Sequence, residues 1–121
     1  MRTGRVVIGG KEYLTCFSTR VLMTLEERGN SADQELARIL NSGKVTDSFW
    51  LLAQLIDAGD RYAKIEGIEN PGKLTLDEII DLVGIDEYDT MFHAIAETTK
   101  YGSEPTVEIK TPKNTETTQA E

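Results

Sequence analysis

The chain has 121 residues, a usual size for one domain and enough to bury a single modest core. Its formal net charge is −8, and Lys and Arg nowhere form a run. These features argue against nucleic acid or an anionic membrane as the partner, because both require a basic surface. No stretch reaches the ~20 apolar residues of a membrane span, and residues 1–5 do not resemble a signal peptide. The lone Cys16 suits a reducing compartment, so we expect a protein of the cytosol.

The first element is predicted to be a β-hairpin. Residues 6–8 and 13–17 are rich in β-branched and aromatic side chains. The Gly9-Gly10 pair between them supplies the positive φ angles that a two-residue turn needs. Two amphipathic helices are expected next, one beginning at residues 18–19 and ending at Gly29, the other beginning at residues 31–33 and ending near Gly43.

The third helix, predicted over residues 47–65, is apolar on two sides. One stripe at helical spacing consists of Phe49, Leu52, Ala53, Ile56 and Ala63, and the other of Trp50, Leu51, Leu55, Ala58 and Tyr62. The second stripe either packs beneath the hairpin or binds another molecule. Because aromatic side chains dominate interfaces, the candidate partner-binding residues are Trp50, Leu51, Leu55 and Tyr62.

Two further helices are predicted after a break at residues 70–72. Residues 75–78, Thr-Leu-Asp-Glu, form a capping box for a short helix that directs Leu82 inward. Asp86 is expected to cap the last helix, which ends at Gly102. Residues 74–100 also have the order of a helix-turn-helix motif, with two predicted helices joined by a short turn. However, the candidate recognition helix begins with carboxylates, which would face the phosphates of DNA. Ordinary packing of a helical hairpin is therefore the preferred interpretation.

The chain becomes polar from Ser103 onward. Such a segment cannot bury enough apolar surface to offset its ordering entropy, so residues 103–121 are predicted to be a disordered tail behind a single domain over residues 1–102. Within it, the alternation of Thr106-Val107-Glu108-Ile109 is a candidate strand that could add to a partner. The predicted fold class is α+β and mainly α, with the N-terminal β-hairpin packed on a bundle of about five helices.

The residues that could catalyse a reaction or bind a metal do not form a recognisable catalytic motif or set of metal ligands in the sequence. His93 has Asp89 four residues before it and Glu97 four residues after it, but along a helix these carboxylates lie ~12 Å apart. That separation is too large for one ion. Cys16 lies in an apolar strand, where an inert buried thiol is expected, and Ser48 is explained by helix capping. We therefore expect no enzyme activity, no cofactor and no metal.

The order of these features resembles the tail assembly chaperones of long-tailed bacteriophages and prophages over residues 5–101. The similar segments are Gly-Gly-Lys-Glu-Tyr at 9–13, Phe-Ser-Thr-Arg at 17–20, Leu-Glu-Glu-Arg-Gly at 25–29 and Leu-Thr-Leu-Asp-Glu-Ile at 74–79. The resemblance implies a small helical protein of the bacterial host cytoplasm, absent from the mature virion, that binds the tape measure protein and tail tube subunits during virion assembly. It supplies no catalytic residues.

The apolar pattern and the charge of the chain are consistent with the function that this resemblance implies. A chaperone for an apolar helical client needs exposed apolar surface, and a high negative charge keeps such a surface soluble. Self-association into a homo-oligomer through the same stripe is an open possibility. The alternative is an acidic antitoxin-like or regulatory adaptor whose surface binds a basic protein partner.

Overall fold

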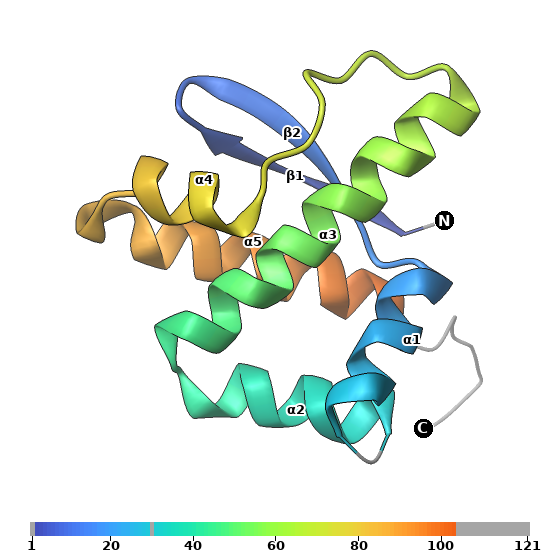
Figure 1. Cartoon of the computed structure of the whole chain (residues 1–121), viewed down its shortest axis with the longest axis vertical. Helices are drawn as coiled ribbons and strands as arrows, with labels where there is room; N and C mark the ends of the chain where they lie inside the picture. The colour runs from blue at the N-terminus through green and yellow to red at the C-terminus, as the bar shows by residue number, and fades with distance from the viewer. Residues whose placement is uncertain (1, 30, 104–121) are drawn as a thin grey trace, which may run out of the picture.

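The structure is a computed structural model that describes residues 2–29 and 31–103. The predicted tail, apart from Ser103, and the candidate strand at residues 106–109 lie outside these described residues. The elements in chain order are β1 (Thr3–Ile8), β2 (Lys11–Cys16), α1 (Thr19–Arg28), α2 (Ala32–Ser42), α3 (Val45–Glu66), α4 (Leu76–Leu82), a 3-10 turn η1 (Ile85–Glu87) and α5 (Tyr88–Ser103). The predicted fold class, a mainly helical α+β protein with an N-terminal hairpin, is confirmed (Figure 1).

The hairpin forms where the Gly-Gly pair predicts it. β1 and β2 are antiparallel, with Ile8 opposite Lys11 next to the turn and Thr3 opposite Cys16 at the other end. Gly9 and Gly10 have φ angles of 59° and 79°. Positive φ at both central residues is the requirement of the two-residue turns whose twist matches that of the strands.

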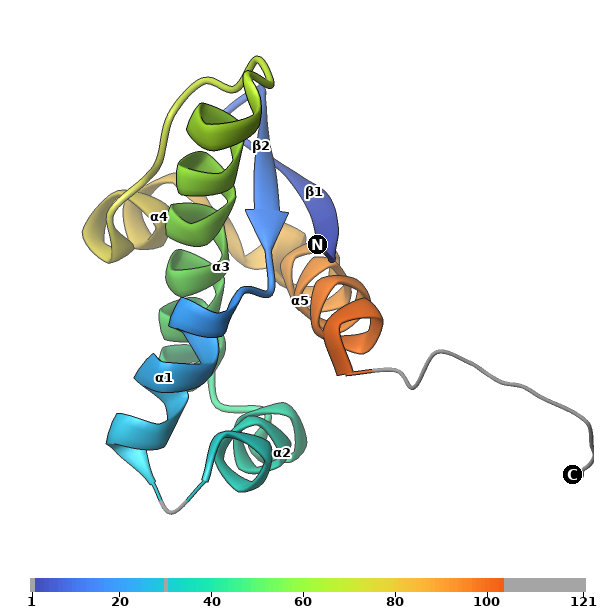
Figure 2. The ribbon, with the colours of Figure 1, turned by 90° about the vertical axis from the view of Figure 1, so that its right-hand side faces the viewer.

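α3 is the central element of the molecule and contacts β2, α1, α2, α4 and α5. It lies along β2, while α5 lies along β1 on the other side of the hairpin (Figure 2). The first apolar stripe of α3 and most of the second are therefore inside the molecule. The whole first stripe is buried, and so are the side chains of Leu51, Leu55 and Ala58 in the second.

The close approach of α3 to β2 depends on Gly59. A Cβ atom at this position would overlap the carbonyl oxygen of Leu14 and lie 2.9 Å from the Cα of Thr15. Asn70 completes the contact: its Oδ1 accepts a hydrogen bond of 2.9 Å from the Leu14 N–H, and its Nδ2 donates to Asp60 Oδ1 at 3.2 Å. The outer edge of β2 is thus covered by a helix backbone and an amide side chain.

Several local predictions are confirmed by hydrogen bonds. Thr75 and Glu78 make both bonds of the capping box, and the Ser31 hydroxyl accepts from the Gln34 N–H at the start of α2. Two i,i+4 ion pairs also form in α3, with 3.0 Å between Arg61 and Asp57 and 3.1 Å between Lys64 and Asp60. These features depend on residues close in the sequence.

Three predictions that concern helix ends are wrong. Ser48 does not cap α3, because the helix begins at Val45, one turn earlier, with Lys44 as the N-cap. Asp86 lies within the turn η1 and does not cap α5. The Glu87 carboxylate accepts a hydrogen bond from the Gly84 N–H, at the start of η1. Leu82 ends α4 beside the hairpin turn and remains 48% exposed.

Replacing Gly59 with alanine is expected to destabilise the protein by about 3 kcal/mol or more, because the added methyl group has no space beside β2. Intrinsic helix propensity alone predicts the opposite sign, a gain of ~1 kcal/mol. Urea unfolding followed by circular dichroism measures the difference. Gly84→Ala is the control: there the added Cβ would meet side-chain carboxylate oxygens alone, that of Asp86 at 2.8 Å and that of Glu87 at 3.6 Å, which can rotate away, and a loss below ~1 kcal/mol is expected. Equal losses in both variants would contradict the packing argument.

Candidate protein-binding site

The predicted contact stripe on the third helix is only partly accessible. Leu51 and Leu55 are 0% exposed, so their assignment as partner-binding residues is wrong for this structure. The physical reason is that α3 lies between the hairpin and the other helices, which leaves neither of its sides open over most of its length. Trp50 and Tyr62 are half-buried and pack against the core, and a contact through their exposed parts stays a prediction.

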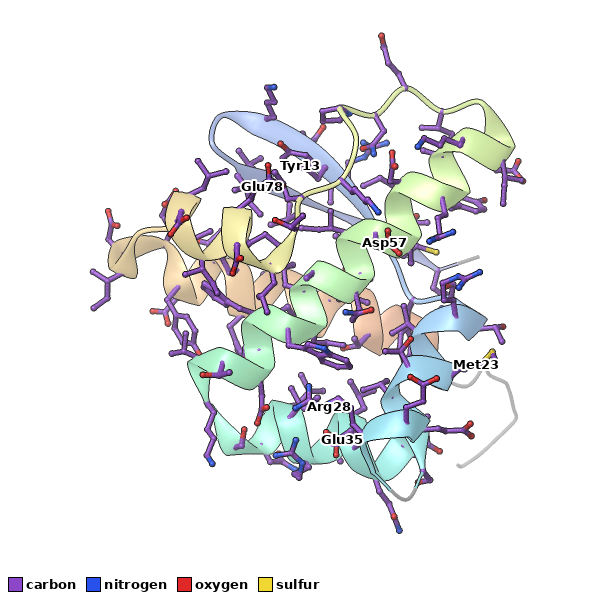
Figure 3. All side chains as sticks on the ribbon, viewed as in Figure 1. Tyr13, Met23, Arg28, Glu35, Asp57 and Glu78 are labelled. Carbon is purple, nitrogen blue, oxygen red and sulfur yellow. The ribbon has the colours of Figure 1, made fainter. Side chains whose placement is uncertain are left out.

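The exposed face of Trp50 is partly covered by a cation. The guanidinium carbon of Arg28 lies 4.0 Å from the centroid of the indole ring. Arg28 also forms ion pairs with Asp47 at 3.0 Å and with Glu35 at 3.6 Å. Figure 3 shows Arg28 and Glu35 close together between α2 and α3. Trp50 therefore packs against a charged junction of three helices and does not form part of an open apolar surface.

The same junction contains two buried carboxylates. Glu35 is 4% exposed and Asp47 is 8% exposed, and Arg38 donates hydrogen bonds to both, at 2.6 Å and 3.1 Å. The hydrogen bonds from Arg38 hold the pKa of Glu35 below its ordinary value. Burial acts to raise the pKa of Asp47, but the hydrogen bonds from Arg38 and Arg28 outweigh it and the net pKa is lowered. Both carboxylates are stabilised in the charged form, and they join α1, α2 and α3.

An open apolar groove lies at the other face of the N-terminal turns of α3. Its volume is about 700 Å³. One wall is Val45, Thr46 and Phe49 of α3, and the rest is built from α4, η1 and the first turn of α5. The rings of Phe49 and Tyr88 lie 6.0 Å apart between their centroids, and the Tyr88 hydroxyl donates to the Gly43 carbonyl oxygen at 3.3 Å. Two aromatic rings thus connect the walls.

Aliphatic side chains lie exposed in and beside this groove. Ile85 is 96% exposed, and Val45 and Ile80 are about half exposed, at 54% and 50%. All three line the groove. Ile85 is not among the partner-binding residues predicted from the sequence. The signal that could have identified it is that this isoleucine, next to Gly84, Asp86 and Glu87, fits the apolar pattern of neither neighbouring helix.

The segment that forms most of the groove is strongly acidic. Residues 74–99 contain seven Asp and Glu residues and neither Lys nor Arg. Asp89 lines the groove, and Asp86 and Glu87 are exposed in η1 next to Ile85. An apolar groove with carboxylates at its rim favours an apolar ligand that also carries positive charge.

The candidates for catalysis lie apart from the groove. Cys16 is fully buried, and this burial raises the pKa of its thiol, which opposes nucleophilic reactivity. His93 is exposed, with its Nε2 3.8 Å from Glu97 Oε2. Within residues 2–29 and 31–103, no group of three His, Cys, Asp or Glu side chains is placed to hold a metal ion. None of the helices in this part of the chain combines the length and hydrophobicity that a membrane span requires.

Comparison with protein-family models, with curated proteins and with solved structures finds no match to this chain. The resemblance to tail assembly chaperones therefore depends on the segments quoted from the sequence. The surfaces of the molecule itself supply the remaining arguments about function.

Acidification is expected to destabilise the fold through Glu35 and Asp47. A carboxylate whose pKa is lower in the folded than in the unfolded state contributes stability above the unfolded value, and loses it as the pH falls through ~4 toward the folded value. The urea midpoint should therefore fall between about pH 6 and about pH 3. In the double variant Glu35→Gln, Asp47→Asn this fall should be shallower. An unchanged slope would show that the junction does not carry the acid sensitivity.

Proposed function

We propose that the protein is a non-catalytic tail assembly chaperone that binds a helical segment of its client in the apolar groove between α3, α4 and the start of α5. The observation that carries the proposal is the set of exposed aliphatic side chains in that groove, with Ile85 almost fully exposed. A side chain of this kind in water offers apolar area that a partner can bury. The groove replaces the predicted stripe as the main contact surface.

A helix is the ligand form that fits this surface best. Val45, Ile80 and Ile85 come from three different elements and face one groove, and an amphipathic helix presents apolar side chains to such a groove at i, i+3, i+4 and i+7. The acidic rim selects a helix that carries Lys or Arg beside its apolar face. The volume of about 700 Å³ has room for several side chains.

The identity of the client follows from the resemblance in the sequence. It points to the tape measure protein and the tail tube protein, bound in the bacterial host cytoplasm and released before the virion matures. A client with an exposed apolar helical face would associate with its own copies before assembly, and an acidic protein bound to that face would prevent this.

An acidic antitoxin-like or regulatory adaptor is the second candidate, and the carboxylates of residues 74–99 are the observation that favours it. The two functions differ in how binding responds to salt. Contacts between exposed charges weaken as ionic strength rises, because the Debye length falls to ~3 Å at 1 M salt. Burial of apolar side chains in a groove is not weakened in this way.

The groove is tested by placing a charge in it. Ile85→Asp and Ile80→Asp are expected to weaken client binding at least tenfold each, because a buried carboxylate would replace an apolar contact. Co-purification with tape measure and tail tube proteins, followed by titration of the purified pair in low and high salt, measures the effect. Both side chains are exposed, so the fold should persist in each variant.

Ile65→Asp provides a matched control, since Ile65 is 78% exposed but lies at the C-terminal end of the helix, ~30 Å from Val45. It should bind like the unmodified protein. Full binding by folded Ile85→Asp and Ile80→Asp variants would exclude the groove as the contact. Binding that persists in these variants but disappears in high salt would favour the adaptor instead.

A further inference from the structure

A second hollow lies next to the groove, between α3 and the segment that leads into α4. Its volume is about 320 Å³, and its lining includes Gln54, Asp57 and Arg61 of α3 together with residues 73–76. Leu76 lines both the hollow and the groove. The hollow therefore continues the groove toward the C-terminal end of α3.

One row of side chains on α3 connects the two openings. Thr46 and Phe49 line the groove, and Ala53, Asp57 and Arg61 line the hollow. Neighbours in this row are three or four residues apart, a spacing that places them on one side of a helix. Thr46 and Asp57 are separated by ~16 Å along the helix axis. A bound helix of about three turns would cover this length.

The hollow contains two cations and one carboxylate. Asp57 accepts a hydrogen bond of 3.0 Å from Arg61 Nε and one of 3.2 Å from Lys73 Nζ. Burial acts to raise the pKa of Asp57, but the two hydrogen bonds outweigh it, so the carboxylate is charged. One positive charge therefore remains uncompensated among the three groups. The Arg61 and Lys73 side chains are 53% and 56% exposed, so this charge faces the solvent.

The carboxylates in the first turn of α4 lie outside the hollow. Neither Asp77 nor Glu78 is part of its lining. The Glu78 carboxylate accepts a hydrogen bond of 2.8 Å from the Thr75 N–H, within the capping box. Figure 3 shows the Glu78 and Asp57 side chains apart, on α4 and on α3. The hollow is therefore a local site of positive charge in a chain whose net charge is −8.

The opposite end of this surface is negative. Asp89 lines the groove, Asp86 and Glu87 are exposed in η1, and none of the described residues that line the groove is Lys or Arg. Lys44 precedes α3 but is not part of the lining. This end lies at the first turns of α3, because the start of α5 packs on Phe49. The surface is thus negative at the start of α3 and positive about three turns later, with apolar side chains between.

From this charge distribution we infer that the groove and the hollow together bind one amphipathic client helix in a fixed orientation, parallel to α3. The first turn of the bound helix carries Lys or Arg and lies against Asp86, Glu87 and Asp89. Its last turn carries Asp or Glu and lies in the hollow against Arg61 and Lys73. The dipole of the bound helix favours the same orientation, because its positive N-terminal end lies at the carboxylates and its negative C-terminal end at the cations. The inference rests on the proposed function, to which it adds the direction and the charge pattern of the client segment.

Two designed peptides of about 14 residues, ~21 Å long as helices, test the orientation. Both are acetylated and amidated, and they have the same composition and the same leucine face. One carries Lys in its first turn and Glu in its last turn, and the other has these charges reversed. By fluorescence anisotropy at about 50 mM salt, the Lys-first peptide should bind at least tenfold more tightly. Peptide helicity does not produce this result, because Glu in the first turn and Lys in the last turn stabilise the free helix of the reversed peptide.

The double variant Arg61→Gln, Lys73→Gln removes the cations of the hollow. Its affinity for the Lys-first peptide should fall by about threefold to tenfold, whereas its affinity for the reversed peptide should not fall. Lys11→Gln, Lys64→Gln is the matched control, because it makes the same change in net charge at lysines outside the groove and the hollow. It should bind like the unmodified protein. All four of these cationic side chains are exposed, so the fold should persist in both variants.

The possible results separate the orientation from the groove itself. A preference for the Lys-first peptide that the control keeps and the Arg61→Gln, Lys73→Gln variant loses supports the inference. Equal binding of the two peptides, tighter binding of the reversed peptide, or a preference that persists without Arg61 and Lys73 would overturn the orientation and leave the groove in place. Absence of binding by both peptides at about 1 mM, or undiminished binding to the Ile85→Asp variant, would overturn the groove as a helix site and the inference with it.

Discussion

The contact of Gly59 with the backbone of β2 is the constraint on which the other features of the structure depend. A helix that approaches a strand without an intervening side chain lies deep in the molecule, and α3 accordingly contacts β2 and each of the other helices. This position buries Leu51 and Leu55 together with the opposite stripe. It also covers the outer edge of β2 with helix backbone and the Asn70 side chain.

The groove arises from the same arrangement. The hairpin covers α3 around Gly59, whereas the helix begins at Val45, more than three turns earlier. There one face of α3 joins α1 and α2 through the junction of Arg28, Glu35, Arg38 and Asp47. Another face meets the short α4, the turn η1 and the first turn of α5. A seven-residue helix cannot cover that face fully. Val45, Ile80 and Ile85 consequently remain open to a ligand.

The groove that we propose as functional combines two kinds of chemistry. The groove offers apolar side chains with carboxylates nearby, which suits a helix with positive charge.

Local features were determined by the sequence alone. The Gly9-Gly10 turn, the Thr75–Glu78 capping box and the ion pairs of Asp57 and Asp60 each involve residues at most four positions apart, so their patterns predict their geometry. The mainly helical α+β fold class follows from the same patterns. The sequence also shows that α3 has two apolar sides, but not which molecule covers them.

Only the tertiary structure decided which apolar residues are accessible. Periodicity is the same for a stripe that is covered by the chain itself and one that is covered by a partner, so Leu51 and Leu55 could not be distinguished from true contact residues. Gly59 gives no local signal, because its role depends on Leu14, a residue far away in the sequence. Ile85 belongs to no periodic pattern, and its exposure results from the packing of three elements around the groove. Burial is a property of contacts between distant segments, and a local pattern does not contain them.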